Sequence, residues 1–385
     1  MSESSHVSAT GGRRETILQI AAIFGLLYLF LLSIDLMGVG FKLFGKKFAE
    51  GLIANCSSPV IGLFIGVFAT SLIQSSSTTT SLTVGFVGGG VLPLEFAIPI
   101  VMGANIGTTI TNILVSFGFV TRKEDFRRAF AGATVHDFFN LCAVALFFPL
   151  ELKFHFIQRM AERLTVVFDT AGGVKFSSPL KAIIVPVADA VKHFLTGTLE
   201  LSPVASGVII LLASVAVLIG SLVFLVKTLR TLIVKKAEHF INKYLFRNDF
   251  TALLLGVCLT TVAQSSSVTT SLIVPLVGAG VVTLYRCYPY TLGANVGTTC
   301  TALLASLATV EAGEGGSRGV TLAFAHLLFN LMGIAVFYPL RRIPISMARW
   351  LAALAAESKR WAVVFTLATF FGIPLLMILV ARWAR

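Results

Sequence analysis

The chain has 385 residues, of which 56% are hydrophobic and only 12% are charged, and its formal net charge at pH 7 is +12. Average soluble domains carry about twice that share of charged residues, so the composition excludes an ordinary soluble enzyme. The basic residues lie in short clusters between apolar runs. This distribution is typical of cytoplasmic loops and lipid contact, and it argues against a nucleic-acid partner.

Apolar runs long enough to cross a bilayer, which takes about 20 residues, occur along the whole chain. In chain order they cover residues 17–41, 129–149, 201–226, 319–340 and 362–380. The first run is longer than the core of a signal peptide, so we expect it to remain as a helix. A transmembrane β-barrel would show short alternating segments instead, and these runs therefore predict an all-α polytopic membrane protein.

Two further segments, residues 51–94 and 250–284, carry no charge and are rich in Gly, Ser and Thr. Each has a polar stretch near its middle, "QSSSTTTSL" from Gln74 and "QSSSVTTSL" from Gln264. We interpret each segment as a re-entrant helical hairpin that enters and leaves the membrane on one side, with the polar stretch at its tip.

The chain is an internal duplication. At a fixed offset of 190 residues, 22 of 38 positions are identical between residues 74–111 and 264–301, and "GANIGTT" from Gly103 returns as "GANVGTT" from Gly293. Three spans are expected between the hairpins, near residues 95–120, 129–150 and 201–226. Because three is an odd number, the second copy is predicted to be inverted in the membrane, which is the inverted-repeat plan of secondary transporters.

Loop charge predicts which side each part faces. The loop at residues 122–128 has a net charge of +2, whereas its counterpart at residues 311–318 has a net charge of −1. The basic loop is therefore expected to be cytoplasmic and the acidic one external. The predicted regions are a cytoplasmic tail (1–15), the first transmembrane repeat (16–150), an external connector (151–200), the second repeat (201–341), and an amphipathic segment with the last transmembrane helix (342–385).

The repeated polar groups predict a binding site. Unpaired polar groups in hydrocarbon cost several kcal/mol each, so they must face each other, a water-filled cavity or a ligand. Neutral oxygens suit a hard cation such as Na⁺, and a helix that begins at a hairpin tip offers N–H groups to an oxyanion. We expect Gly103, Gly107, Gly293 and Gly297 to allow non-helical backbone there. The alternative is that the Ser and Thr residues only hold helices together.

Asp137 is a carboxylate inside a predicted span, where charge is costly and usually functional. It occurs only in the first copy, because Leu327 fills the matching position. We interpret it as a cation ligand or a proton carrier. His136 and His326 match each other, and either a packing role or a site role is open for them. A Ser–His–Asp hydrolase is not predicted, because His136 and Asp137 point about 100° apart on a helix.

The paired "QSSS" motifs, the "GANIGTT" elements and "RRAFAGATVHDFFN" from Arg127 to Asn140 resemble the type II sodium–phosphate cotransporters, over roughly residues 20–380. The resemblance implies a bacterial-type member in the plasma membrane that takes up inorganic phosphate with Na⁺ by alternating access, with a transport unit moving against a scaffold. Ala131, Ala133 and Asp137 match the pattern of electrogenic members, which implies an additional Na⁺ at Asp137.

From the resemblance together with the repeated polar groups, we predict two sets of ligands. The predicted phosphate-binding residues are Gln74, Ser75, Ser76, Ser77, Gln264, Ser265, Ser266 and Ser267. The predicted Na⁺ ligands are Asp137, Asn105, Thr108, Thr79, Thr111, Asn295, Thr298, Thr269 and Thr301. No cofactor is expected, and Na⁺ is the coupling ion.

Phosphate, Na⁺ and the lipid bilayer are the expected partners, and association of two copies into a homodimer is left open. The alternatives are a Na⁺-coupled carrier of another oxyanion or of a dicarboxylate, and an ion channel.

Overall fold

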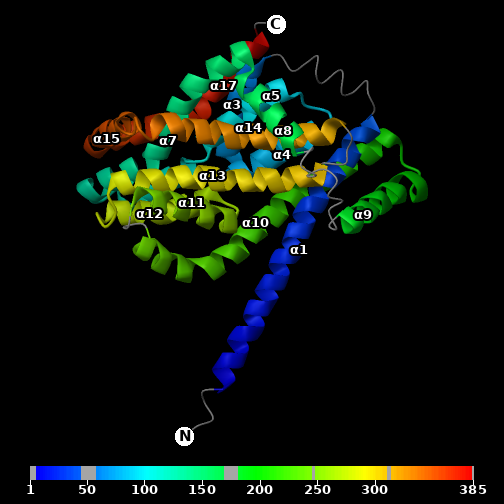
Figure 1. Ribbon diagram of the computed structural model, residues 1–385, viewed down its shortest axis with the longest axis horizontal. Coiled ribbons are helices and arrows are strands. Elements are labelled where there is room, and N and C mark those ends of the chain that lie inside the picture. The colour runs from blue at the N-terminus through cyan, green and yellow to red at the C-terminus, as the bar shows by residue number, and fades with distance from the viewer. Residues whose placement is uncertain (1–5, 45–57, 169–180, 245–247, 310–313, 384–385) are drawn as a thin grey trace.

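The structure is a computed structural model that describes residues 6–44, 58–168, 181–244, 248–309 and 314–383. Within these ranges the chain forms helices joined by short turns and contains no strand (Figure 1). Some predicted regions extend outside the described residues. They are parts of the N-terminal tail (1–5), of the first repeat with the start of its hairpin (45–57), of the connector (169–180), of the second repeat with its acidic loop (245–247 and 310–313) and of the C-terminal segment (384–385).

Six helical stretches in the described ranges are long and apolar enough to cross a membrane, which confirms the all-α polytopic prediction. They are Leu18–Met37, Leu94–Phe119, Lys123–Phe154, Pro203–Leu225, Ser317–Phe337 and Lys359–Ala381.

The first copy begins with one long helix, continues with the hairpin and ends with an amphipathic helix. Its helices are α1 (His6–Phe44), α3 (Pro59–Ile73), α4 (Ser76–Gly88), α5 (Leu94–Gly107), α6 (Ile110–Ser116), η1 (Phe117–Phe119), α7 (Lys123–Phe154) and α8 (Phe156–Phe168). The connector contributes α9 (Lys181–His193) and the short π-helical turn η3 (Phe194–Thr198).

The second copy repeats this order and is followed by the C-terminal helices. Its elements are α10 (Pro203–Tyr244), α11 (Asp249–Ala263), α12 (Ser266–Gly278), α13 (Leu284–Thr309), α14 (Glu314–Phe337), α15 (Arg342–Glu357), α16 (Lys359–Leu367), η4 (Ala368–Gly372) and α17 (Ile373–Trp383).

Both hairpins break where the sequence predicts. Helix α3 ends at Ile73 and is followed by Gln74, which has left-handed backbone angles (φ 57°, ψ 27°). Ser75 is extended, and α4 starts directly after it. Gln264 repeats this geometry (φ 52°, ψ 24°), and Ser265 precedes α12. Serine is a preferred residue before a helix because its hydroxyl accepts a bond from a free backbone N–H. Each Gln-Ser pair therefore ends one helix and starts the next.

The two copies interlock through reciprocal contacts. The second arm of each hairpin packs on the long helix of the other copy, so that α4 contacts α14 and α12 contacts α7. The amphipathic helices do the same, since α8 packs on α14 and α15 packs on α7. Helices α13 and α14 run side by side through the middle of the molecule (Figure 1). This exchange is what a two-fold relation between the copies produces, while their inversion across a bilayer stays a prediction.

The repeated glycines Gly103 and Gly293 serve close helix packing and not a non-helical backbone, which corrects the expectation for these two positions. Gly103 lies within α5 and Gly293 lies within the continuous helix α13. A Cβ added to Gly103 would lie 1.9 Å from the carbonyl oxygen of Leu63 in α3, and one added to Gly293 would lie 1.9 Å from that of Leu253 in α11. Small residues let transmembrane helices approach this closely.

Gly297 follows the same pattern, since it lies within α13. Gly107 is the last residue of α5, and a turn at Thr108 and Thr109 separates it from α6, so the helix does break next to this glycine. A Cβ added to either would lie within 2.7 Å of a threonine Cβ on the first hairpin arm, at Thr70 or Thr260 respectively. These glycines therefore set how closely each hairpin arm lies against the helix that follows it.

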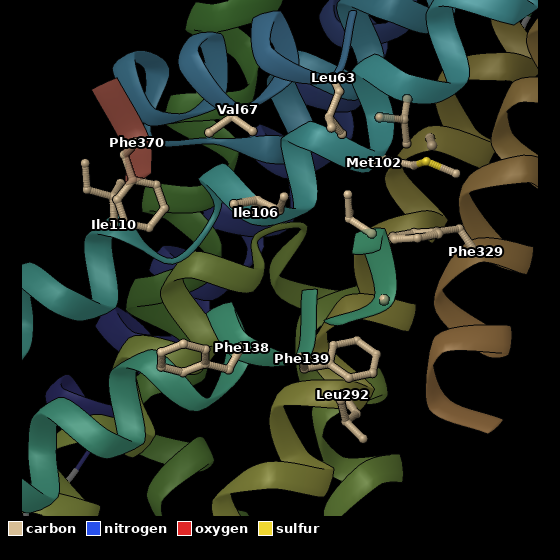
Figure 2. Close-up of a cluster of buried hydrophobic side chains, with 14 of the residues drawn as sticks. Leu63, Val67, Met102, Ile106, Ile110, Phe138, Phe139, Leu292, Phe329 and Phe370 are labelled. Atoms are coloured by element: carbon tan, nitrogen blue, oxygen red, sulfur yellow. The ribbon is translucent and has the colours of Figure 1, made fainter. Parts of the chain in front are cut away.

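One apolar core joins the two copies (Figure 2). Phe139 of α7 packs edge-to-face against Tyr288 of α13 and Phe337 of α14, with ring centroids 6.2 and 6.5 Å apart. Phe147 meets Phe329 in the same way at 6.4 Å. Aromatic pairs in this geometry add about 0.5–1.5 kcal/mol beyond the area they bury. The hairpins are thus held by a core to which both copies contribute.

The close approach of α11 and α13 predicts that Gly293→Ala destabilises the fold. The added methyl group would collide with a backbone carbonyl, and overpacking of this kind costs about 1–3 kcal/mol or more. The measurement is the thermal unfolding midpoint of the purified protein in detergent. Gly25→Ala in α1 is the control, because a Cβ there meets no atom within 4 Å. Equal midpoints for Gly293→Ala and the wild type would contradict the proposed packing.

Candidate functional site

The two hairpin tips touch each other. The hydroxyl of Ser77, at the start of α4, donates to the backbone carbonyl of Gln264 at 3.1 Å. The hydroxyl of Ser267, at the start of α12, donates to the carbonyl of Thr108 at 3.3 Å. Residues that are 187 positions apart in the sequence are therefore in direct contact, and the polar stretches satisfy part of each other's hydrogen-bonding capacity.

A cavity of about 270 Å³ lies between the tips, and we call it the tip cavity. Its lining contains no charged side chain. Because a water molecule takes about 30 Å³ of the liquid, a small hydrated anion fits this volume. The lining residues are Ile73, Gln74, Ser75, Ser77, Thr78, Thr111, Ile219, Val223, Gln264, Ser265, Ser267, Val268 and Ser271.

Two helix N-termini adjoin this cavity. The hydroxyl of Ser75 accepts from the backbone N–H of Thr78 at 3.2 Å, and Ser265 does the same for Val268 at 3.3 Å. The preceding N–H groups in the first turn of each helix have no intrahelical acceptor. They carry the positive end of the helix dipole, equivalent to about half an elementary charge. Such a pair of N-termini can bind an anion without any Lys or Arg.

The two tips differ in how they use their glutamine. The side-chain oxygen of Gln264 accepts a hydrogen bond from Thr301 at 2.9 Å, and Gln264 is buried. In the first copy Gln74 is exposed to the tip cavity, and the hydroxyl of the matching Thr111 is buried without a partner among the described residues. In the first copy the amide is exposed to the cavity and the hydroxyl is buried and unpaired, whereas in the second copy the two groups are paired with each other.

Several predicted ligands instead brace the hairpins. Thr79 hydrogen-bonds to Thr70 across the first hairpin at 2.9 Å, and Thr269 bonds to Thr260 across the second at 2.7 Å. Ser76 and Ser266 are buried and do not line the tip cavity. The hydroxyls of Thr108 and Thr298 donate to carbonyls of their own helices, at 2.9 and 3.0 Å. Part of the polar cluster thus holds helices together, as the alternative interpretation of these residues expects.

Asn295 joins a buried network with the first copy's α7. The Nε2 atom of His136 lies 2.5 Å from the Oδ1 atom of Asn295, and the Nδ2 group of Asn295 donates to the Oδ1 atom of Asn140 at 2.8 Å. Asn140 in turn donates to the backbone carbonyl of Asn105 at 2.8 Å. The network therefore crosses from one copy into the other.

Asn105 is the counterpart of Asn295 and makes the corresponding contacts with α14 of the second copy. Its Nδ2 group donates to the Oδ1 atom of Asn330 at 3.0 Å, and its own Oδ1 atom lies 3.0 Å from the Nε2 atom of His326. The Nδ1 atoms of His136 and His326 are both buried without a partner among the described residues. Because an amide oxygen only accepts, each Nε2 donates, and a neutral ring then presents Nδ1 as a free acceptor.

Asp137 lies apart from the tip cavity. Its side chain is fully buried in α7, and neither carboxylate oxygen has a hydrogen-bond partner among the described residues. It is not part of any group of three or more acidic, His or Cys side chains that could hold a metal in this part of the chain. A buried charge without a partner is strongly destabilising. The carboxylate must therefore be protonated or bind a cation.

The structure adds residues that the sequence did not single out as ligands. Ile219 and Val223 of α10 form an apolar wall of the tip cavity, and no chemical signal distinguishes them from other residues of that span. Asn140 and Asn330 complete the buried network, and their identity at an offset of 190 residues could have indicated this role.

Comparison with known proteins gives one consistent result. The chain matches the family described as Na+/Pi-cotransporter over residues 29–165 and 217–373. It is 35% identical to sodium-dependent phosphate transport protein 2A of Rattus norvegicus, over 95% of this chain and 68% of that protein. It is 33% identical to protein 2B of Homo sapiens, over 93% of this chain and 64% of that protein. No solved structure matches the chain.

The difference between the two tips predicts opposite effects of two matched substitutions. Thr301→Ala removes the donor to Gln264 and leaves a buried amide oxygen unpaired, so it should lower the free energy of unfolding by about 1–3 kcal/mol. Thr111→Ala removes a hydroxyl that has no partner, so stability should stay unchanged or increase. Thermal unfolding of both variants in the same detergent makes the comparison. A larger loss for Thr111→Ala than for Thr301→Ala would show that the described asymmetry is wrong.

Proposed function

Since the chain belongs to the Na+/Pi-cotransporter family, we propose that it is a secondary active transporter that moves inorganic phosphate together with Na⁺ into the cell across the plasma membrane. Its relatives in rat and human are named sodium-dependent phosphate transport proteins. The observation that carries the proposal is the uncharged tip cavity between two helix N-termini. We do not assign an enzymatic reaction, and association of two copies stays a prediction.

Phosphate would bind at the tips through the serine hydroxyls and the free N–H groups of α4 and α12. Ser75, Ser77, Ser265 and Ser267 all line the cavity, and helix N-termini are established phosphate sites in proteins. Two helix dipoles together supply about one elementary charge. Phosphate carries more negative charge than that at neutral pH, so the remaining charge must come from bound cations. Coupling to Na⁺ follows from this deficit.

Na⁺ would bind where oxygens have no partner in the protein. Gln74 and Thr111 offer an amide and a hydroxyl oxygen next to the tip cavity. Asp137 offers a buried carboxylate, which supports the additional Na⁺ site that makes transport electrogenic. Neutral and carboxylate oxygens are the ligands that hard cations prefer. We propose these two places for Na⁺, with Asn105 and Asn295 holding the helices around them in position.

Alternating access is supported by the unequal tips. The side chain of Gln264 accepts a hydrogen bond from Thr301 of α13, whereas Gln74 is exposed and Thr111 stays unpaired. Repeats of the same sequence can exchange such arrangements, which lets the cavity open first to one side and then to the other. In the opposite state we expect Gln74 to pair with Thr111 and Gln264 to become free.

Phosphate uptake should require a Na⁺ gradient. With external Na⁺, purified protein in proteoliposomes is expected to accumulate radiolabelled inorganic phosphate against its gradient. When choline replaces Na⁺, phosphate uptake should fall to the level of protein-free liposomes. The physical reason is that the tip cavity lacks a fixed positive charge, so cations must offset the charge of the anion. Uptake that is the same in both cations would contradict the proposal.

The same assay separates the alternatives. Inhibition by arsenate but not by succinate or sulfate supports phosphate as the substrate, while the reverse would favour another anion. A channel would show no uphill accumulation and no saturation with phosphate concentration.

Asp137 should carry the charge that makes transport voltage-dependent. In Asp137→Gly we expect phosphate transport to continue at a reduced rate while the phosphate-evoked current and its voltage dependence are lost, because the cation bound by this carboxylate is no longer carried. Leu327→Gly, at the matching position of the second copy, is the control and should keep the current. The measurements are uptake and current on the same preparation. An unaltered current in Asp137→Gly would exclude the proposed role.

A further inference from the structure

A second cavity shares no lining residue with the tip cavity and is basic instead of neutral. It has a volume of about 540 Å³ and lies among the first turns of α7, the turn between α12 and α13, and helix α15. Helix α15 packs against α7 and α13 at this end of the helix layer (Figure 1). We call it the arginine pocket, and its lining residues are Arg127, Arg128, Ala131, Val277, Gly280, Val282, Thr283, Leu284, Arg349 and Ala352.

The three guanidinium groups are not fully neutralised. Arg127 pairs with Glu124 at 2.8 Å and Arg128 pairs with Asp125 at 2.7 Å, and neither carboxylate lines the pocket. Arg349 has no carboxylate partner among the described residues, and its guanidinium lies 5.1 Å from the centre of the Tyr285 ring. Arginine stays charged at every physiological pH, so the pocket keeps a net positive charge.

Both copies contribute arginines to this pocket, and the duplication shows that the place related to it by the repeat is less basic. At an offset of 190 residues, Ser317 replaces Arg127 and Glu95 replaces the Tyr285 that supports Arg349. Arg159 is the counterpart of Arg349 on α8. The place related to the pocket by the repeat therefore lacks one guanidinium and gains a carboxylate, so it attracts an anion less strongly. Common ancestry of the two copies does not account for the basic pocket.

We propose that the arginine pocket binds a phosphate group, and that this group belongs to an anionic lipid at the membrane surface. Guanidinium groups match the geometry of phosphate oxygens through paired hydrogen bonds. Helix α15 exposes Ile343, Met347 and Trp350, spaced as one apolar face next to Arg349, with exposed fractions of 47%, 38% and 64%. An interfacial amphipathic helix buries such a face among acyl chains.

The predicted topology places this pocket on the cytoplasmic side, since it contains Arg127 and Arg128 of the basic loop. Anionic lipids are concentrated in the cytoplasmic leaflet and attract basic residues there. The pocket also reaches the end of the second hairpin. Arg128 donates from its Nε group to the carbonyl of Gly278 at 3.0 Å. A bound phosphate group would thus connect α7 and α15 to the hairpin that forms half of the tip cavity.

Lipid binding is measured directly as thermal stabilisation of the purified full chain in a neutral detergent. Short-chain phosphatidylglycerol is titrated in buffer with choline in place of Na⁺, so that the tip cavity and transport do not contribute. We expect a rise in the unfolding midpoint for the wild type and for Arg159→Gln. In Arg349→Gln the half-saturating lipid concentration should increase about tenfold, because one charged hydrogen-bonding group is lost. For Arg349→Lys the half-saturating lipid concentration should lie between those of the wild type and Arg349→Gln.

Two further titrations test whether the pocket requires an anionic ligand and whether the phosphate group comes from a lipid or from free phosphate. Phosphatidylcholine, which has no net charge, should give no stabilisation. Inorganic phosphate is added alone, and stabilisation that Arg349→Gln abolishes would assign the pocket to a free phosphate ion instead of a lipid. Identical titration curves for the wild type, Arg349→Gln and Arg127→Gln would overturn the proposal, as would equal stabilisation by the two lipids. None of these results depends on whether the chain transports phosphate.

Discussion

A helix that begins inside an apolar layer leaves its first backbone N–H groups without partners, and hydrocarbon supplies none. This chain has two such starts, after Ser75 and Ser265, and both caps are partly buried by the reciprocal packing of the hairpins. Serine hydroxyls satisfy one N–H group at each start, and the tips bond to each other's chain. In the proposed function the N–H groups that remain bind the anion at the tip cavity, so the proposed anion site depends on the two helix breaks.

The absence of charge in the lining of the tip cavity links anion binding to cation binding. A site built on arginine would hold phosphate regardless of Na⁺ and would release it slowly. A site built on helix dipoles and hydroxyls binds weakly until cations complete its charge. The arginine pocket has the opposite character within the same chain, since its lining carries fixed positive charge. The tip cavity therefore suits transient binding of a transported anion, and the arginine pocket suits stable binding of a phosphate group.

The sequence predicts the hairpin breaks at Gln74 and Gln264 well, because polar residues in apolar runs and their exact repetition are local signals. It misjudges Gly103 and Gly293, because a glycine that permits a bend and one that permits a close helix crossing look the same in the chain. It places all repeated Ser, Thr and Asn residues in one cluster, whereas the fold distributes them among the cavity, the hairpin braces and the Asn–His network. That distribution depends on which helices meet, and spacing alone does not encode it.

The central claim is that the oxyanion binds between the two serine-bearing helix starts. Arsenate is a phosphate analogue whose arsenic atom scatters X-rays anomalously, so crystals grown with Na⁺ and arsenate test the claim directly. The account predicts an anomalous peak within hydrogen-bonding distance of Ser77 and Ser267, present with Na⁺ and absent with choline. A peak located elsewhere in the molecule, or one that persists at the tips without Na⁺, would contradict it.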